Sequence, residues 1–155
     1  MTNKSLSIRE AVKSDEIVIA EHLCHIALEL GVSSTSMRHD WLAKTVQFID
    51  RARQELHYKG FVAEMNDAIV GSTSCQILEL YPMVSKDYQK GYIWGVYVDP
   101  AYRRQGIATK LMQQAMAYLK EIGCTKAVLH ASDAGKQLYT SLGYTESNEM
   151  TLSLN

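Results

Sequence analysis

The sequence predicts an α/β fold, a mixed sheet that contains one parallel strand–helix–strand crossover. An aromatic and β-branched strand ends at Asp99-Pro100, because proline lacks the amide donor that a strand ladder needs. Apolar residues then recur at helical spacing over residues 107–122, and a short apolar strand follows at 126–130. This order makes the two strands parallel and places the loop between strand and helix at a carboxyl end of the sheet.

The first third of the chain predicts one strand and two helices. Residues 6–10 alternate apolar and polar side chains, and Ser14 or Asp15 can cap the helix that follows and ends at Gly31. The polar break at 33–36 offers N-caps for a second helix that runs to about residue 57. The apolar side of the second helix is formed by Leu42, Thr45, Ile49, Ala52 and Leu56.

The remaining segments predict hairpins around the crossover. Residues 60–65 and 68–80 read as strands joined by a tight turn at Asn66-Asp67. Residues 135–142 read as a short helix before Gly143, and 144–145 with 149–154 read as a terminal hairpin. The predicted order is β-α-α-β-β-β-α-β-α-β-β, with residues 1–155 forming a single domain.

Composition narrows the class of protein. A formal net charge of -1 gives no reason to expect wholesale binding to nucleic acid or to anionic membranes. No apolar run reaches the length of a membrane span, and three scattered cysteines fit a reducing compartment, so we expect a cytoplasmic protein. Cys24 lies between His22 and His25, but no further pair has the spacing of a zinc finger, so we expect no metal.

The junction before the 107–122 helix predicts an anion site. The first turn of a helix has amides without intrahelical partners and carries the positive end of the helix dipole. Gly106 has no Cβ and Ala108 only a methyl group, so a phosphate can approach the backbone closely. Arg103 and Arg104 add positive charge nearby. An ordinary strand-to-helix loop is the alternative for this stretch taken alone.

Two motifs in the right order resemble the GCN5-related N-acetyltransferases. Arg103-x-x-Gly106-x-Ala108 after a strand is similar to the family's acyl-CoA signature, and residues 130–144 are similar to its second block, which ends Leu-Tyr-x-x-Leu-Gly-aromatic. The resemblance implies acetyl-CoA as co-substrate, with its pyrophosphate on the loop and its pantetheine along the strand. The positions that it implies for the coenzyme are Val96, Tyr97, Val98, Arg103, Arg104, Gln105, Gly106, Ile107, Ala108, Thr109, Ser132, Gly135, Lys136 and Tyr139. Ser132 stands where many members have asparagine, and its hydroxyl is shorter and supplies one donor in place of an amide.

The same resemblance implies catalytic roles. Tyr139 matches the family's general acid, since a phenol stays protonated at neutral pH and can donate to a leaving thiolate. The amides of residues 96–98 would polarise the thioester carbonyl. No base is named by the sequence: Glu79 is a weak candidate, and Asp99, His130 and a chain of water molecules are others.

The predicted activity is transfer of an acetyl group from acetyl-CoA to a primary amine by direct attack in a ternary complex. The acceptor is a small molecule or a peptide or protein amine, and Arg38, His39, Trp41, Tyr81 and Tyr88 are candidate contacts for it. The alternatives are a non-catalytic acyl-CoA-binding module and another phosphate binder, although the loop lacks the lysine and hydroxyl residue of a P-loop. The chain would act as a monomer or a homodimer.

Overall fold

A computed structural model describes residues 5–79, 81 and 89–154 of the chain. Five strands form one sheet in the order β1-β2-β3-β4-β5. Their bounds are Leu6–Glu10, Lys59–Met65, Ala68–Leu78, Lys90–Val98 and Lys126–Val128. The first four are antiparallel neighbours and β5 runs parallel to β4, which confirms the predicted mixed sheet and its crossover.

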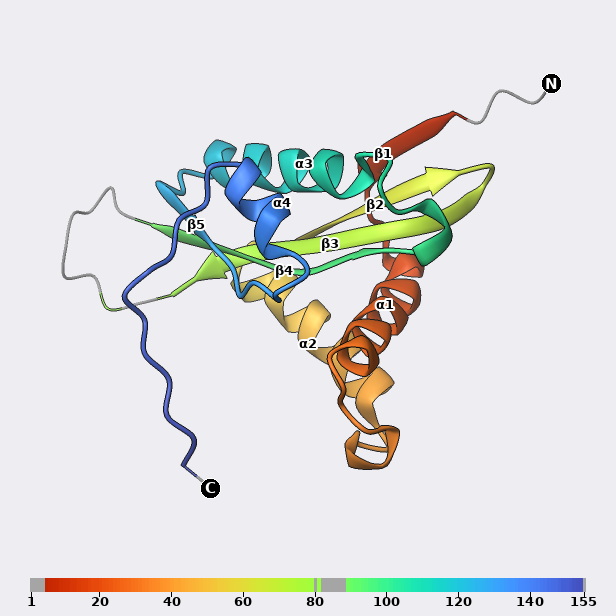
Figure 1. Cartoon of the computed structure of the whole chain (residues 1–155), viewed down its shortest axis with the longest axis horizontal. Helices are drawn as coiled ribbons and strands as arrows, with labels where there is room; N and C mark the ends of the chain where they lie inside the picture. Colours follow the sequence, from red (N-terminus) through yellow and green to blue (C-terminus); the bar gives the residue numbers. More distant parts are fainter. Residues whose placement is uncertain (1–4, 80, 82–88, 155) are drawn as a thin grey trace.

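The helices cover the two faces of the sheet unequally. Helix α3 (Ile107–Glu121) lies on one face, whereas α1 (Glu16–Glu29) and α2 (Trp41–Glu55) lie on the other, as Figure 1 shows. Short α4 (Lys136–Ser141) follows β5. Leu111, Met112 and Ala115 of α3 are fully buried against the sheet, and Ile49 and Ala52 of α2 are buried on the opposite face. Two apolar cores therefore hold the strands between them.

The predicted start of the second helix and the predicted burial of Leu42 are corrected. The polar break forms a separate 3₁₀ turn, Ser34–Ser36, in which the Ser33 hydroxyl accepts from the Thr35 amide, and α2 begins only at Trp41. Leu42 is consequently placed at the outer end of the helix, where it is exposed rather than part of the core. The serines cap the turn and not the helix.

The predicted terminal hairpin is wrong for residues 144–154, none of which lies in a strand. Met150, Leu152 and Leu154 are between 83% and 93% exposed, so the apolar side of the alternating pattern contacts little of the described chain. A strand needs a ladder partner, and β5 is only three residues long. The segment leaves the body of the protein as an extended tail (Figure 1).

Among the described residues, no helix combines the length and hydropathy that crossing a bilayer requires. The same residues contain no group of three or more histidine, cysteine, aspartate or glutamate side chains arranged around a metal position.

Candidate active site

Strand β4 carries a bulge in its second half. Ser72 pairs with Tyr97 and Ser74 with Trp94, so β4 has one residue more than β3 across this interval. Gly95 adopts a φ of 65°, and a Cβ there would lie 2.8 Å from the Leu23 side chain. The ladder is interrupted here, next to the stretch for which an oxyanion role was predicted.

The edge of β4 beside the bulge has no strand partner. The last pair between β4 and β5 is Tyr92 with Val128, so residues 93–98 have no β5 residue opposite them. The Asp99 amide donates to Val70 on the β3 side at 2.8 Å. Because successive amides of a strand point to opposite edges, the Tyr97 amide also faces β3 and the Val98 amide faces the open edge.

The loop before α3 presents backbone amides. The Lys110 amide donates to the Gly106 carbonyl at 3.2 Å, which is the first bond of the helix. The amides of residues 104–109 have no protein acceptor among the described residues. Gly106 has a φ of 76°, and a Cβ there would meet nothing within 4 Å. The open space lies beside unpartnered amides at the positive end of a 15-residue helix, which is a favourable place for phosphate.

Arg103 is engaged by the protein itself. Its Nε donates to the Val98 carbonyl at 2.7 Å, and Nη2 lies 2.6 Å from Glu29 Oε1. The guanidinium also stands over the Tyr97 ring, with 5.6 Å between its carbon and the ring centroid. These contacts tie the loop to β4 and to α1. Arg103 thereby fixes the position of the loop, and contact of its side chain with the coenzyme stays a prediction.

The 132–136 segment is also tied to protein groups. The Gly135 amide lies 3.1 Å from the Ser132 hydroxyl, and the Gly135 and Lys136 amides both donate to the Ser132 carbonyl at 3.0 Å. Lys136 forms an exposed ion pair with Glu146 of the tail. Ser132 therefore shapes the turn into α4.

Tyr139 lies on α4, in the cluster beneath α3. Its ring packs edge-on against Tyr144, with 6.1 Å between the centroids. Burial raises the pKa of Tyr139 above its ordinary value, so the phenol is protonated at neutral pH. The described residues give its hydroxyl no hydrogen-bond partner. A protonated, uncommitted donor is what a general acid requires.

The candidate bases lie at different distances from the bulge. Glu79 follows the last β3–β4 pair, Leu78 with Lys90, five residues along β4 from Gly95. At about 3.3 Å per residue this is roughly 16 Å, so Glu79 lies at the wrong end of the strand for a direct base. His130 lies just past the point where β4 and β5 separate, and its Nδ1 is 2.9 Å from the Tyr92 hydroxyl.

The predicted acceptor contacts are only partly gathered. Arg38 and Trp41 line a pocket together with residues of α1, α2 and β4, whereas His39 and Tyr81 are exposed outside it. Tyr88 lies outside the described residues.

A row of buried hydrogen bonds beneath α1 and α2 was not predicted from the sequence. Alternate residues of β3, Ser72, Ser74 and Gln76, bond to His22 Nδ1 at 2.7 Å, to the Tyr58 hydroxyl at 2.9 Å and to the Trp94 indole nitrogen at 3.0 Å, respectively. The available signal was the group of polar residues in the middle of this strand, of which Ser72, Ser74 and Gln76 share one face because alternate residues of a strand do.

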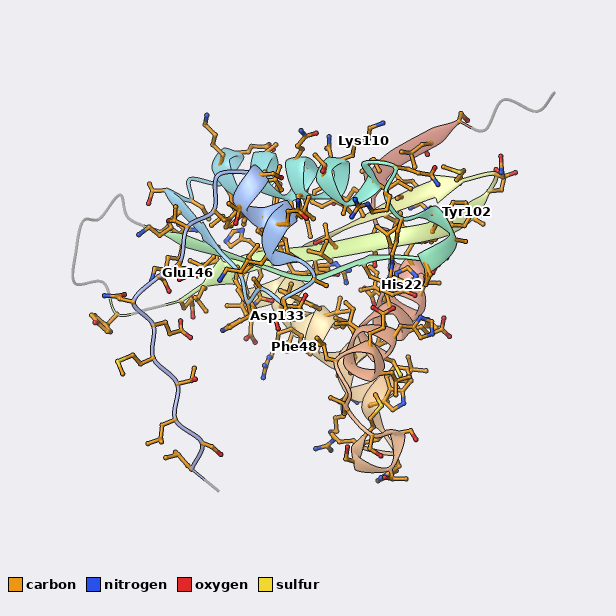
Figure 2. All side chains as sticks on the ribbon, in the orientation of Figure 1. His22, Phe48, Tyr102, Lys110, Asp133 and Glu146 are labelled. Atoms are coloured by element: carbon orange, nitrogen blue, oxygen red, sulfur yellow. The ribbon has the colours of Figure 1, made fainter. Side chains whose placement is uncertain are left out.

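His22 is the histidine of this row and lies on α1 (Figure 2). It is 4% exposed and packs against the Tyr97 ring, with 4.5 Å between the centroids. Burial lowers the pKa of His22 to about 4, the Asp99 charge acts in the opposite direction, and His25 lowers it further. The imidazole is therefore neutral in the folded protein at pH 7.

We expect this histidine to make stability depend on pH. Its folded pKa of about 4 is below the ordinary value of 6.5, so the unfolded chain binds the proton more tightly. The stabilisation is complete above pH 6.5 and is lost as the pH falls toward 4. Thermal unfolding from pH 7.5 to 4 should show a smaller decrease in Tm for His22→Gln than for the wild type. His39→Gln, which removes an exposed histidine outside this row, should follow the wild type, and parallel curves for all three would contradict the assignment.

Comparison with known proteins identifies the family. The model of the acetyltransferase (GNAT) family matches residues 20–144. N-alpha-acetyltransferase 30 of Xenopus laevis is 31% identical over 93 residues, which are 58% of this chain and 33% of that protein. Glucosamine 6-phosphate N-acetyltransferase of Trypanosoma brucei brucei is 30% identical over 105 residues, 67% of this chain and 70% of that protein.

A solved structure agrees over nearly the whole chain. The GCN5-related N-acetyltransferase of Ralstonia eutropha JMP134 superposes with a TM-score of 0.85 at 26% identity, covering 97% of this chain and 99% of that one. The chain spans only about a third of the length of the N-alpha-acetyltransferase 30 relative. The family match covers both motifs, the open edge of β4 and the amides of α3. The chain belongs to the GNAT acetyltransferase family.

Proposed function

We propose that this protein is an acetyl-CoA-dependent N-acetyltransferase that acts on a primary amine. The observation that carries the proposal is that two backbone surfaces follow one another along the chain, the β4 edge over residues 93–98, which has no strand partner, and the amides over 104–109, which have no protein acceptor among the described residues. An extended pantetheine arm can add to a strand edge as another strand would, and a pyrophosphate suits the start of a helix. The two relatives named above are both N-acetyltransferases, which supports the reaction type.

The coenzyme would follow this surface from the bulge to α3. Val96 and Val98 would contact the thioester and pantetheine, with Tyr97 behind them in the strand. The pyrophosphate would rest on the loop and first turn formed by Arg104, Gln105, Gly106, Ile107, Ala108 and Thr109. Arg103 would hold that loop in place through Val98 and Glu29. Ser132, Gly135 and Lys136 would border the coenzyme from the turn before α4.

The reaction would proceed by direct attack in a ternary complex. The lone pair of the amine forms a C–N bond to the thioester carbon, and the carbonyl oxygen becomes an oxyanion stabilised by an amide near the bulge. The C–S bond then breaks, the amine proton leaves to a base, and the thiolate receives a proton from Tyr139. The raised pKa of Tyr139 keeps that proton available at neutral pH.

A relay of three side chains gives the amine proton a route to solvent. Tyr92 bonds to His130 Nδ1 at 2.9 Å, and His130 Nε2 lies 3.5 Å from Glu149 Oε1. Burial raises the pKa of Tyr92 above its ordinary value, so the phenol is neutral at rest. Its oxygen would take the amine proton as its own proton passes to the imidazole, which leaves the phenol neutral again. Glu79 remains the weaker proposal because of its distance along β4.

We expect His130→Gln to lower kcat roughly ten-fold or more with acetyl-CoA affinity unchanged, as loss of a proton acceptor should. Tyr92→Phe should have a similar effect, and the double variant should be no slower than the slower single variant. Glu79→Gln tests the weaker candidate base in the same assay, and we expect it to leave kcat unchanged. The rate of thiol release is measured over pH 6 to 9. A wild-type kcat in His130→Gln would contradict the proposed proton relay.

Binding and turnover together test the proposed function. Acetyl-CoA and CoA should raise Tm in a thermal-shift assay, whereas ATP should not. Thiol release should require an added amine, which separates an enzyme from a binding module. Stabilisation by ATP alone would contradict the assignment of acetyl-CoA as co-substrate. Binding of acetyl-CoA without turnover on any amine would favour the non-catalytic acyl-CoA-binding module.

The free state of Cys24, Cys75 and Cys124 supports a reducing compartment such as the cytoplasm. We propose a single catalytic domain that acts as a monomer or homodimer without nucleic acid or membrane, and light scattering of the purified chain would give the stoichiometry.

A further inference from the structure

An apolar pocket lies on the α1–α2 side of the sheet, opposite the face covered by α3. It has a volume of about 310 Å³, and residues of α1, the loop before α2, α2 and β4 surround it. Its lining consists of Leu23, Arg38, Trp41, Lys44, Thr45, Phe48 and Trp94. Three of these are large aromatic rings, and none is a carboxylate.

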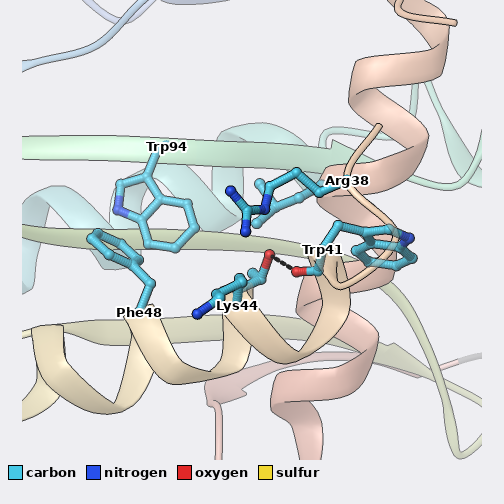
Figure 3. A pocket seen from close by; sticks show the side chains of 7 residues that line it. Arg38, Trp41, Lys44, Phe48 and Trp94 are labelled. Carbon is cyan, nitrogen blue, oxygen red and sulfur yellow. Dashed lines mark hydrogen bonds between the residues drawn. The ribbon is translucent and has the colours of Figure 1, made fainter. Parts of the chain in front are cut away.

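The aromatic wall presents carbon rather than polar atoms. Phe48 and Trp94 lie beside each other (Figure 3) and pack edge-on, with 5.8 Å between centroids. Trp94 donates its indole hydrogen to Gln76 in the buried row on β3. The indole therefore has no unmet hydrogen bond to offer a ligand. A hydrophobic or aromatic group is the occupant that this wall favours, because it replaces water on apolar surface.

The rim of the pocket is positively charged. Lys44 lines the pocket, Arg51 lies outside the lining on the same side of α2, and the described residues place no carboxylate within ion-pair distance of either. Arg51 lies over the Phe48 ring at 5.6 Å. Arg38 bonds to Asp40 at 2.9 and 3.1 Å, so it is compensated. The rim would attract an anionic group and repel a second ammonium group.

The pocket adjoins the place where the acetyl group is expected. Leu23 lines the pocket and also covers Gly95 at the bulge, within 2.8 Å of where a Cβ would be. Trp94 is the residue before that glycine. An acceptor in the pocket would thus direct its amine at the bulge from the face opposite α3.

We propose that the acceptor is a monoamine with an apolar or aromatic side chain and a carboxylate beyond it, as in an apolar α-amino acid or a short peptide. A polycationic amine is disfavoured by the same rim. The proposal rests on the proposed acetyltransferase function and adds the chemistry of its acceptor. The side chain enters the aromatic pocket, the carboxylate faces Lys44, and the α-amine reaches the thioester.

Matched peptides separate the contributions of ring and charge. Phe-Gly should be acetylated with a kcat/KM about three- to five-fold above Phe-Gly-amide, the size expected for one exposed charge pair. The kcat/KM for Phe-Gly should exceed that for Gly-Gly roughly ten-fold or more, because the benzyl group buries apolar area. Spermidine should be the poorest acceptor. Free L-phenylalanine in the same assay distinguishes an amino acid from a peptide as the natural source.

Variants of the lining locate each effect. Lys44→Gln should abolish the preference for Phe-Gly over Phe-Gly-amide by lowering the rate with Phe-Gly, whereas Lys120→Gln on α3 should leave that preference intact. Thr45→Phe should fill the pocket and remove the preference for Phe-Gly over Gly-Gly. Thr45→Val, which keeps the shape and loses only the bond to the Trp41 carbonyl, should retain it.

Three results would overturn the proposal: spermidine as the best acceptor, an equal effect of Lys44→Gln on charged and amidated peptides, or no acetylation of any peptide. A thermal shift with acetyl-CoA accompanies each assay. If one of these results is found and acetyl-CoA still stabilises the protein, only the proposed acceptor is contradicted. If acetyl-CoA does not stabilise the protein, the proposed function is contradicted as well.

Discussion

Tyr139→Phe is expected to lower kcat by roughly ten- to a thousand-fold while acetyl-CoA affinity stays nearly unchanged. The substitution removes only the hydroxyl, and the ring keeps its edge-on contact with Tyr144. The thiolate would then depart without receiving a proton from the protein. Steady-state kinetics of thiol release and a titration of acetyl-CoA measure the two quantities separately.

Tyr144→Phe is the matched control for this effect. Tyr144 belongs to the same cluster, and its hydroxyl is buried without a hydrogen-bond partner among the described residues. Removing that hydroxyl should preserve kcat and should leave Tm equal or slightly higher, because no hydrogen bond is lost. Equal rates for Tyr139→Phe and the wild type would exclude the phenol as the acid.

Gly106→Val is expected to abolish measurable coenzyme binding while the chain still folds. The glycine has a φ of 76°, which a β-branched residue adopts only with strain, and the new side chain would occupy the open space before α3. The expected readout is loss of the acetyl-CoA thermal shift together with a far-ultraviolet circular dichroism spectrum like that of the wild type.

Gly123, at the other end of α3, provides a control because it also has a positive φ. Its φ is 92°, and a Cβ there would also meet nothing within 4 Å. Gly123→Val should lower Tm by a comparable amount, because both substitutions force a side chain into the left-handed region, but it should bind acetyl-CoA normally. Equal loss of affinity in both variants would assign the effect to helix stability instead of a phosphate site.

The crossover was predictable because its signals are local. The stop at Asp99-Pro100, the spacing of apolar residues in α3 and the apolar strand after it each depend on neighbouring residues only. The amides of the α3 first turn follow from any helix start, so that part of the candidate site was predictable as well.

The features that were not predicted depend on contacts between residues that are distant in the sequence. The β4 bulge requires the register against β3, which no local pattern specifies. The pairing of His22 with Ser72 joins residues fifty positions apart. The prediction of the terminal hairpin was wrong because a local pattern suggested a strand that has no partner. The alternation of Met150, Leu152 and Leu154 is typical of a strand, but nothing in the described chain pairs with it.

The extra residue at Gly95 restricts how β4 can change in length. Ile93 upstream and Val98 downstream belong to the core on the α3 face, although they lie five positions apart, an odd number in a structure of period two. Deleting one residue at the bulge would leave four positions between them, an even number, so a regular strand would keep both on the α3 face and Tyr97 beside His22. A single-residue insertion or deletion elsewhere in the strand would exchange the faces of every side chain on one side of the change. The bulge is therefore the place where β4 can differ in length by one residue without exchanging its faces.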